Sequence, residues 1–437
     1  MYKWEFFIKG ELFMLHIDDA KVKEMLLKGN FGLEKEALRV TPLGLFAQTK
    51  HPFPGNHNIV YDYCENQTEI NTPVFQSEEE AVASLYGFTQ TIQKKLTEMP
   101  QPELLWPFSN PPYIRSAKDI PDGAFDPNKA YERDYRRHIE DRYGKYKMCL
   151  CGIHVNFSFA DELLQADFAC SDYEDFQEYK NDLYVALAEN CTAYAWIMTA
   201  VTAASPMMDS SYYEVNILGK TICTGLASTR CSELGYWNFF APLLNYKDIK
   251  SYANSIQHYV DMGLIKAPSE LYFPIRLKPP GKNLLQKLHD EGVCHIELRM
   301  VDLNPLELSG INVMDLKFAH YLLVYLASIP RANLSDKEQV ECIQNFKNAA
   351  HFDLNAVKLN LPGEGMMTIA DAGCSLIDRM KEFYKDFPDE VLEVLDFEKS
   401  KLFSPEKRYA WQLRREFGED FVKKGLEHAK KQQEAIV

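Results

Sequence analysis

Three short stretches of the chain place charged or polar side chains at every second position, with apolar residues at many of the positions between them. They run from Phe31 to Arg39, from Gly152 to Phe159 and from His295 to Val301. Alternation with a period of two is typical of a β-strand that buries one face. The pattern therefore predicts three strands of a sheet that has an apolar back and a front face carrying the chemistry.

The predicted front face is rich in carboxylates. The residues that share a face are Glu34 with Glu36, His154 with Asn156, and Glu297 with Arg299. Carboxylates packed together without counter-charges repel one another and lose hydration. Such a face therefore predicts bound cations, and an oxygen-rich set with one imidazole suits magnesium or manganese better than zinc or copper.

A second acidic segment, Asn58 to Val74, is also strand-like. Glu65, Gln67 and Glu69 share one parity along it. Asp62 has the other parity, so it joins them only if the chain bends between them. Periodicity alone therefore leaves Asp62 outside the predicted face.

Basic residues complement the carboxylates. Arg299 lies two positions from Glu297, and Arg276 lies two positions from Lys278 in the strand-like segment 271–278. A metal-bound polyphosphate needs such guanidinium and ammonium donors as its charge redistributes. The sequence has no Walker A loop and no glycine-rich kinase loop. We therefore expect any nucleotide to bind through bridging metals on the sheet.

Helical periodicity predicts the elements that cover the sheet. Ser77 followed by Glu80 is a capping-box signature, and apolar residues then recur at helical spacing until Pro100. Residues 183–204 and 312–328 are predicted as core helices, and the last hundred residues or so as several surface helices. Helices and strands do not alternate regularly, which favours an α+β fold with a largely antiparallel sheet.

Composition excludes some classes of partner. The chain has 437 residues, 46% of them hydrophobic, and a formal net charge of −15, which argues against a broad grip on nucleic acid or anionic lipid. The longest apolar stretch, 183–204, contains Glu189 and Asn190, so we expect a buried helix there and no membrane span. Ten cysteines without framework spacing, and an N-terminus without a signal-peptide pattern, predict a cytoplasmic location. We expect a monomer or a weak homo-oligomer.

Seven segments carry a family resemblance and follow one another from about residue 31 to about residue 330. They are FGLEKEALRV, WPFSNPPYI, YERDYRRHIEDRYG, GIHVNFSF, STRCSELGY, ELYFPIRLK and HIELRMVDLNP. Together they resemble the glutamate–cysteine ligases (γ-glutamylcysteine synthetases) of the bacterial type. The resemblance implies a glutamine-synthetase-like, curved and largely antiparallel catalytic sheet covered by helices on its outer face. It also implies a catalytic domain over 1–330 and a C-terminal helical region over 331–437 packed on it.

The resemblance further implies an activity. Members of the family use ATP to phosphorylate the γ-carboxylate of glutamate. The amino group of cysteine then attacks the acyl phosphate, and γ-glutamylcysteine forms in the first step of glutathione biosynthesis. This agrees with the predicted front face, because metals neutralise the phosphate chain while an arginine stabilises the transferring group. The implied cofactors are ATP and Mg²⁺, with Mn²⁺ as the alternative cation, and the implied partners are small-molecule substrates.

Matching positions imply roles for individual residues. The implied metal ligands are Glu34, Glu36, Asp62, Glu69, His154 and Glu297. The implied catalytic residues at the transferred phosphoryl group are Arg299 and Arg136. The residues implied around the amino-acid substrates are Tyr63, Tyr135, Arg230 and Tyr236, and those implied on the nucleotide side are Arg276 and Lys278. The resemblance thus includes Asp62, which periodicity left out.

The chain departs from the family pattern in three places. Trp237, Asn238 and Phe239 stand where the family carries small and polar residues with a lysine, Tyr63 stands where phenylalanine is common, and the C-terminal region is shorter. The first two departures lie near the implied acceptor pocket, so ligation of glutamate to a different small amine is one alternative. A catalytically silent nucleotide-binding relative is another, and the retained carboxylates and Arg299 argue against it.

Overall fold

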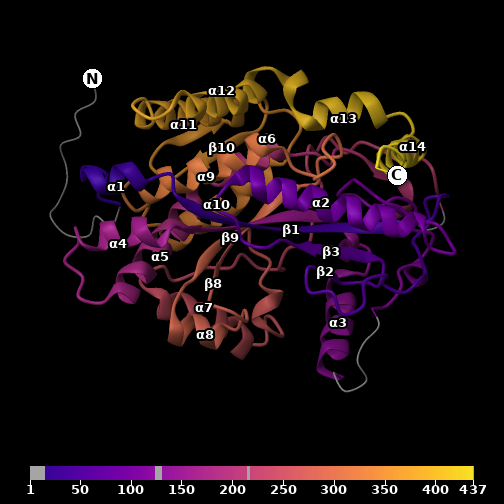
Figure 1. The fold of residues 1–437 in the computed structure, drawn as a ribbon, viewed down its shortest axis with the longest axis horizontal. Helices are drawn as coiled ribbons and strands as arrows, with labels where there is room; N and C mark the ends of the chain where they lie inside the picture. Colours follow the sequence, from indigo (N-terminus) through magenta and orange to yellow (C-terminus); the bar gives the residue numbers. More distant parts are fainter. Residues whose placement is uncertain (1–14, 124–129, 214–216, 437) are drawn as a thin grey trace.

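A seven-stranded sheet forms the centre of the molecule in the computed structural model, which describes residues 15–123, 130–213 and 217–436 (Figure 1). The strands are β1 (Gly29–Val40), β2 (Ile59–Tyr61), β3 (Gln67–Asn71), β4 (Leu104–Leu105), β5 (Gly152–Phe159), β8 (Ile275–Lys278) and β9 (His295–Asp302). Their order is β2-β3-β1-β5-β9-β8, with β4 paired to β1, and each of these pairings is antiparallel. The expectation about a signal peptide falls mainly on residues 1–14, which lie outside the described residues.

Strand pairing places the predicted front-face residues beside one another. The facing pairs are Glu36 with Glu69, Glu34 with His154, Asn156 with Glu297, and Arg276 with Glu297. The strands predicted at 31–39, 152–159 and 295–301 are therefore confirmed. Because side chains of one parity share a face, this register assembles the front face from five neighbouring strands, β3, β1, β5, β9 and β8.

The back of the sheet is apolar and covered by helices. Its core residues include Leu33, Val155, Phe157 and Leu298, each at most 1% exposed. The helices are α1 (Ala20–Met25), α2 (Glu78–Thr97), α4 (Asp161–Phe168), α5 (Phe176–Tyr194), α6 (Trp196–Thr202), α9 (Val313–Ala327) and α10 (Asp336–Ala349). Of these, α2, α5 and α6 contact the strands, and α9 lies against α2, α5 and α6. The predicted α+β fold, with helices covering one face of an antiparallel sheet, is confirmed.

Lys35 is an exception on the apolar face. It lies between Glu34 and Glu36 in β1, so its side chain points to the back, where it is 4% exposed. Its ammonium donates to Thr89 Oγ1 at 3.1 Å and to the Leu308 carbonyl at 3.0 Å. Burial lowers the pKa of Lys35 to about 7. Strict alternation places Lys35 on this face, but the prediction from the sequence did not single it out.

The predicted helix over 183–204 is wrong in one respect, because it is two helices that meet at Ala195. Apolar residues continue across this break, so periodicity does not detect it. Glu189 and Asn190 are buried and bind the last turn of α9 and the chain that follows it. Glu189 accepts from the Leu334 backbone at 2.7 Å, and the Asn190 amide donates to the Leu326 carbonyl at 2.8 Å. Among the described residues, no helix is long and apolar enough to cross a membrane.

The C-terminal region is not purely helical. A hairpin of β10 (Lys358–Leu361) and β11 (Gly365–Thr368) precedes α11 (Ile369–Phe383), α12 (Asp389–Phe403), α13 (Tyr409–Phe417) and α14 (Phe421–Glu434). These four helices form the outer layer at the top of Figure 1, and α12 packs on α9 and α6. On the opposite side of the sheet lie α3 (Ala130–Tyr143), α7 (Ile249–Asp261) and α8 (Leu285–Glu291). The division into 1–330 and 331–437 stays a prediction.

Candidate active site

A cavity of about 370 Å³ opens on the front of the sheet. Every site residue proposed from the sequence lines it except Arg230. These lining residues are Glu34, Glu36, Asp62, Tyr63, Glu69, Tyr135, Arg136, His154, Tyr236, Arg276, Lys278, Glu297 and Arg299. Arg230 lines a smaller adjoining cavity, which it shares with Tyr236 and Arg299. Residues from five strands, the β2–β3 turn, α3 and two loops thus converge on one space.

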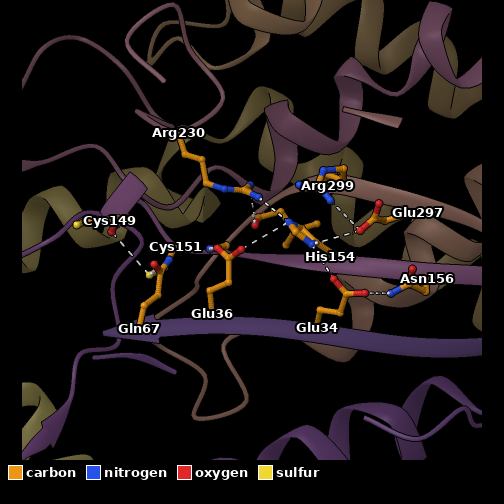
Figure 2. A network of polar contacts seen from close by, with 12 residues as sticks. Glu34, Glu36, Gln67, Cys149, Cys151, His154, Asn156, Arg230, Glu297 and Arg299 are labelled. Atoms are coloured by element: carbon orange, nitrogen blue, oxygen red, sulfur yellow. Dashed lines mark hydrogen bonds and ion pairs between the residues drawn. The ribbon is translucent and has the colours of Figure 1, made fainter. Parts of the chain in front are cut away.

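Glu34, His154 and Glu297 form the tightest cluster of possible ligands in the cavity (Figure 2). One ligand atom from each lies within 4.8 Å of the other two. His154 Nδ1 lies 2.9 Å from Glu34 Oε2 and 3.4 Å from Glu297 Oε1. The Asn156 amide donates to the other oxygen of Glu34 at 3.0 Å. Two carboxylates and an imidazole at this spacing suit a divalent cation that prefers oxygen ligands.

The His154 ring connects two parts of the site. An Arg230 amino group lies 3.3 Å from its Nε2, and an arginine only donates, so Nε2 accepts and Nδ1–H donates to Glu34. Burial, followed by the charge of Arg299, lowers the pKa of His154 to about 4, which keeps the ring neutral near pH 7. A cation can therefore bind this ring only in place of one of the two contacts.

Two features of β5 allow this arrangement. The register between β5 and β9 shifts between Ile153 and Val155, which places His154 at a β-bulge. At Gly152 a Cβ atom would lie 2.3 Å from Cζ of Arg230, so only glycine leaves room for the guanidinium to cross the strand.

Glu297 is surrounded by positive charge. Its carboxylate lies 2.9 Å from an Arg299 amino group and 3.2 Å from Lys278 Nζ. Burial acts to raise the pKa of Glu297, but Arg299 and Lys278 hold that pKa far below its usual value. In return, burial acts to lower the pKa of Arg299, but Glu297 together with Tyr236, Glu34 and Glu36 holds that pKa above its usual value. This side of the cavity is therefore charged and balanced without a metal.

Glu36, Asp62 and Glu69 form a contrasting acidic group. Within the described residues no lysine or arginine makes an ion pair with them, and Glu36 accepts only a backbone hydrogen bond, from Gly152 at 3.0 Å. Burial, followed by the charge of Asp62, raises the pKa of Glu36 to about 8 and that of Glu69 well above its usual value. Burial also raises the pKa of Asp62. A divalent cation would supply the missing positive charge, so these residues fit a metal better than they fit one another.

Asp62 joins this group through the bend that periodicity required. Strand β2 ends at Tyr61, and the Asp62 N–H donates to the Gln67 carbonyl at 3.0 Å, which closes the turn into β3. Glu65 and Gln67 do not line the cavity. The Glu65 carboxylate accepts from the His51 backbone at 2.6 Å, and the Gln67 amide contacts Cys151.

Helix α3 covers this turn. Arg136 donates to the Asp62 carbonyl and lies over the Tyr63 ring, 5.6 Å from its centroid. The Tyr63 hydroxyl donates to Glu140 Oε1 at 2.6 Å. The hydroxyl that distinguishes Tyr63 from phenylalanine therefore joins the turn to α3. At the end of α3 nearest the sheet, the fully buried Glu270 accepts from the Tyr143 hydroxyl at 2.9 Å, which fixes the helix that carries Tyr135 and Arg136.

Aromatic side chains form the wall of the adjoining small cavity, whose volume is about 40 Å³. Tyr236 meets Tyr272 edge to face with their centroids 4.8 Å apart. Trp237 also lines this cavity, where its indole N–H donates to the Ser232 carbonyl at 2.7 Å and its ring packs on Phe346. Phe239, in contrast, is 72% exposed and stacks on Tyr143. Of the bulky departures after Tyr236, Trp237 is the one that shapes the site.

A third cavity, of about 360 Å³, adjoins the opposite end of the front face. Glu34 lines both this cavity and the main one, and Asn156, Ser158 and His295 contribute polar groups, while Val74 contributes apolar surface. Sequence reasoning did not find this cavity. It also missed Tyr272, although that residue lies in the segment ELYFPIRLK and could have been found there.

Comparisons with known proteins agree with this geometry. A profile of the glutamate–cysteine ligase family matches residues 14–264 and 240–349. The chain belongs to the glutamate–cysteine ligase family. The resemblance seen in the sequence is thereby confirmed.

The relatives of this ligase-family chain include longer proteins. It is 32% identical over 416 residues to the glutathione biosynthesis bifunctional protein GshAB of Listeria monocytogenes, covering 91% of this chain and 53% of that protein. It is 30% identical over 393 residues to GshAB of Clostridium perfringens, covering 87% of this chain and 49% of that protein. The chain thus spans about half the length of the curated relatives it matches.

Solved structures show the same fold. Glutamate–cysteine ligase GshA from Francisella tularensis, solved in complex with AMP, matches with a TM-score of 0.83 and 22% identity, covering 94% of this chain and 89% of that one. The bifunctional glutathione synthetase from Pasteurella multocida matches with a TM-score of 0.81 and 25% identity, covering 96% of this chain and 54% of that one. The α+β fold of this ligase-family chain is therefore shared with both.

Proposed function

We propose that this chain uses ATP to join L-glutamate, through a γ-glutamyl phosphate, to the amino group of L-cysteine, giving γ-glutamylcysteine in the first step of glutathione biosynthesis. Membership of the glutamate–cysteine ligase family supports the reaction. The observation that carries the proposal is the front face itself. Glu36, Asp62 and Glu69, which form no ion pair with a lysine or arginine of the described residues, lie in the same cavity as Arg299, which is held by Glu297. The ten free thiols fit a cytoplasmic enzyme.

The metal ligands proposed are Glu34, Glu36, Asp62, Glu69, His154 and Glu297. Mg²⁺, or Mn²⁺ in its place, is the cation that this oxygen-rich set favours. When bound, it would neutralise charge along the phosphate chain of ATP. The raised pKa values of Glu36 and Glu69 support this assignment, because each carboxylate lacks a cation that burial makes necessary.

The basic residues then act on the phosphoryl group and the substrates. Arg299 stabilises the transferring group as its charge redistributes, and Glu297 keeps its guanidinium oriented at 2.9 Å. Arg136, fixed by the Asp62 carbonyl, is the second proposed donor. Phosphorylation is needed because a free carboxylate has a poor leaving oxygen, whereas an acyl phosphate has a good one. Arg276 and Lys278 are proposed to bind phosphate oxygens of the nucleotide.

The two adjoining cavities suggest how the substrates are arranged. The cavity of about 360 Å³ is large enough for a nucleoside and meets the main cavity at Glu34, so we place the nucleoside there. The small aromatic cavity lies beside Arg230 at the other end, so we place the amino-acid substrates near Tyr63, Tyr135, Arg230 and Tyr236. Tyr236 and Tyr272 would also limit access of water to the acyl phosphate.

Trp237 supports a second candidate, which is ligation of glutamate to another small amine. Its ring occupies the wall of the small cavity, where a change of volume alters which side chain fits. Phosphoryl activation would persist in that case, because it depends on the carboxylates and Arg299.

Phosphate release from ATP, measured with glutamate, magnesium and a panel of amines, tests both candidates. We expect release that depends on cysteine. Release with other amines but not with cysteine would overturn only the acceptor assignment. The absence of amine-dependent release with every amine would overturn the ligase proposal and favour a catalytically silent relative.

A further inference from the structure

A cavity of about 270 Å³ lies in the C-terminal region and shares no lining residue with the active-site cavity. The loop after α10, the C-terminal part of α12 and the first residues of α13 enclose it. Phe352, Leu354, Leu402 and Trp411 give it apolar walls, and Arg408 supplies a guanidinium. None of these residues takes part in the proposed ligase chemistry.

Arg408 carries a buried charge without an anion. The residue is 2% exposed, and its guanidinium donates to the carbonyls of Phe352 at 2.7 Å and Ala200 at 3.2 Å. Its Nε–H has no partner among the described residues, and the hydrogen bonds of its guanidinium there go to backbone carbonyls and to no carboxylate. Burial lowers the pKa of Arg408 to about 10, and Asp353 only partly opposes this. A buried cation of this kind is costly unless an anion compensates it.

The neighbouring Lys401 does not need that anion, because its charge is already compensated. Its ammonium lies 2.6 Å from Asp315 and 2.8 Å from Glu398, all three side chains being at most 2% exposed. Two carboxylates thus face this one ammonium, and burial raises the pKa of Glu398 well above its usual value. The charge beside the cavity that lacks a counter-ion is therefore that of Arg408.

We propose that this cavity binds a small organic carboxylate with an apolar body. Its carboxylate faces Arg408, and its hydrocarbon part packs against Leu354, Leu402 and Trp411. At roughly 30 Å³ for each water-sized unit, the cavity holds a molecule of about nine heavy atoms. The exposed Asp353 also lines the cavity, and its carboxylate would accept from an ammonium group of such a ligand. The carboxylate can thus belong to an amino acid or to a simple carboxylic acid.

The cavity is also connected to the active site, and this step rests on the proposed function. Arg408 binds the carbonyl of Phe352, whose N–H donates to the Gly225 carbonyl at 2.9 Å. The Ser228 N–H donates to the Ala350 carbonyl at 3.0 Å, and Arg230 follows two residues later. A ligand that moves Arg408 would therefore move the segment 350–352 and the segment 225–230 that is hydrogen-bonded to it. We expect it to change the KM for an amino-acid substrate and to leave kcat nearly constant.

Calorimetric titration of the full chain, without ATP or glutamate, tests binding apart from catalysis. The probes are L-leucine, 4-methylpentanoate, which lacks the amino group, and 3-methylbutylamine, which lacks the carboxylate. We expect binding of at least one carboxylate at millimolar or lower concentration and none of the amine. Tighter binding of leucine identifies an amino-acid site, and tighter binding of 4-methylpentanoate identifies a carboxylic-acid site. Failure of both carboxylates to bind would overturn the proposal.

Variants locate the site. Asn355→Phe adds a ring at an exposed lining position and should weaken binding about tenfold or more by occupying the cavity. Gln344→Phe makes the same change at an exposed position on α10 that does not line the cavity, and it should bind as the wild type does. Arg408→Lys should also weaken binding, and the Asn355 variant keeps the test valid if the arginine variant fails to fold. Equal binding by the wild type and Asn355→Phe would overturn the assignment.

Fluorescence and kinetics complete the test. Trp411 lines the cavity, so carboxylate binding should change tryptophan emission in the wild type and not in Trp411→Phe. If the chain binds the carboxylate with an unchanged KM, the site stands and the connection to Arg230 is overturned. If ligase activity is absent altogether, binding is still decided by the titration, so the two proposals fail separately.

Discussion

The carboxylates on the two sides of the active-site cavity have different charged neighbours and different pKa values. Glu297 is held between Arg299 and Lys278, and its pKa lies far below the usual value in spite of full burial. Glu36 is also buried but forms no ion pair with a lysine or arginine of the described residues, and burial together with the charge of Asp62 raises its pKa to about 8, although Arg230 and Arg299 partly oppose this. The first side is stable as it stands, whereas the second is short of positive charge. We infer that Glu297 mainly orients basic groups, and that the Glu36 side is where a cation contributes most.

The largest effect is expected from Arg299→Ala, on the Glu297 side. Turnover should fall by a factor on the order of 10² to 10³, as for the loss of one donor to a transition state. Phosphate release at saturating substrates and magnesium measures it. Arg299→Lys, which keeps the charge but loses the planar donor, should recover only part of the activity. Turnover near that of the wild type would show that Arg299 does not contact the transferring group.

The next largest effect is expected in the magnesium requirement of variants on the Glu36 side. Glu36→Gln and Glu69→Gln should each raise the magnesium concentration for half-maximal activity by about tenfold, because each removes a proposed ligand. Glu65→Gln is the matched control. It lies in the same hairpin and is buried, but its carboxylate binds the His51 backbone and does not line the cavity. Magnesium titrations that match the wild type for all three variants would contradict a ligand role.

A smaller effect should appear in the pH dependence of stability without metal. Because the pKa of folded Glu36 is raised to about 8 from a usual 4.5, the native state binds more protons than the unfolded state between these values, and the stability that Glu36 contributes falls as pH rises. The advantage of Glu36→Gln in Tm over the wild type should therefore grow from pH 5 to pH 8. His154 and Lys35 also titrate, but they are common to both proteins and cancel in the difference.

Glu297→Gln provides the opposite case. The pKa of folded Glu297 is lowered, so its contribution is fully present above pH 4.5 and is lost only as pH falls below that value. The variant should be less stable than the wild type by a constant amount from pH 6 to pH 8. Thermal denaturation at a series of pH values measures both variants. Parallel curves of Tm against pH for Glu36→Gln and Glu297→Gln would contradict the proposed difference between the two sides.

The smallest effect is expected at Trp237, outside both carboxylate groups. Trp237→Phe removes the indole hydrogen bond to Ser232 and part of the wall of the small cavity. The KM for the acceptor amine should rise about threefold to tenfold, the equivalent of one hydrogen bond. The magnesium titration should stay the same. A changed magnesium requirement with a constant KM for the acceptor amine would contradict the assignment of Trp237 to the acceptor pocket.

The sequence predicted most of the sheet because alternation of polar and apolar residues follows directly from strand geometry. It identified the front-face residues of β1, β5 and β9, and the family resemblance added Asp62, whose position depends on the β2–β3 turn. The break at Ala195 and the β10–β11 hairpin were not predicted, because local periodicity does not change at the first and is too short at the second. The sequence also did not predict which carboxylates of the site have basic partners, because this depends on which strands pair.

Gly152 has a consequence for how the binding of one ligand affects the binding of another. The missing Cβ lets Arg230 cross β5 and reach the imidazole of His154, so the proposed acceptor residue and the proposed metal would compete for one ring. A substrate carboxylate that draws Arg230 away frees Nε2 of His154 for a cation. By thermodynamic reciprocity, a cation on that nitrogen frees Arg230 for the carboxylate. Amino-acid substrate and metal should therefore bind cooperatively, and any side chain larger than hydrogen at position 152 should uncouple them.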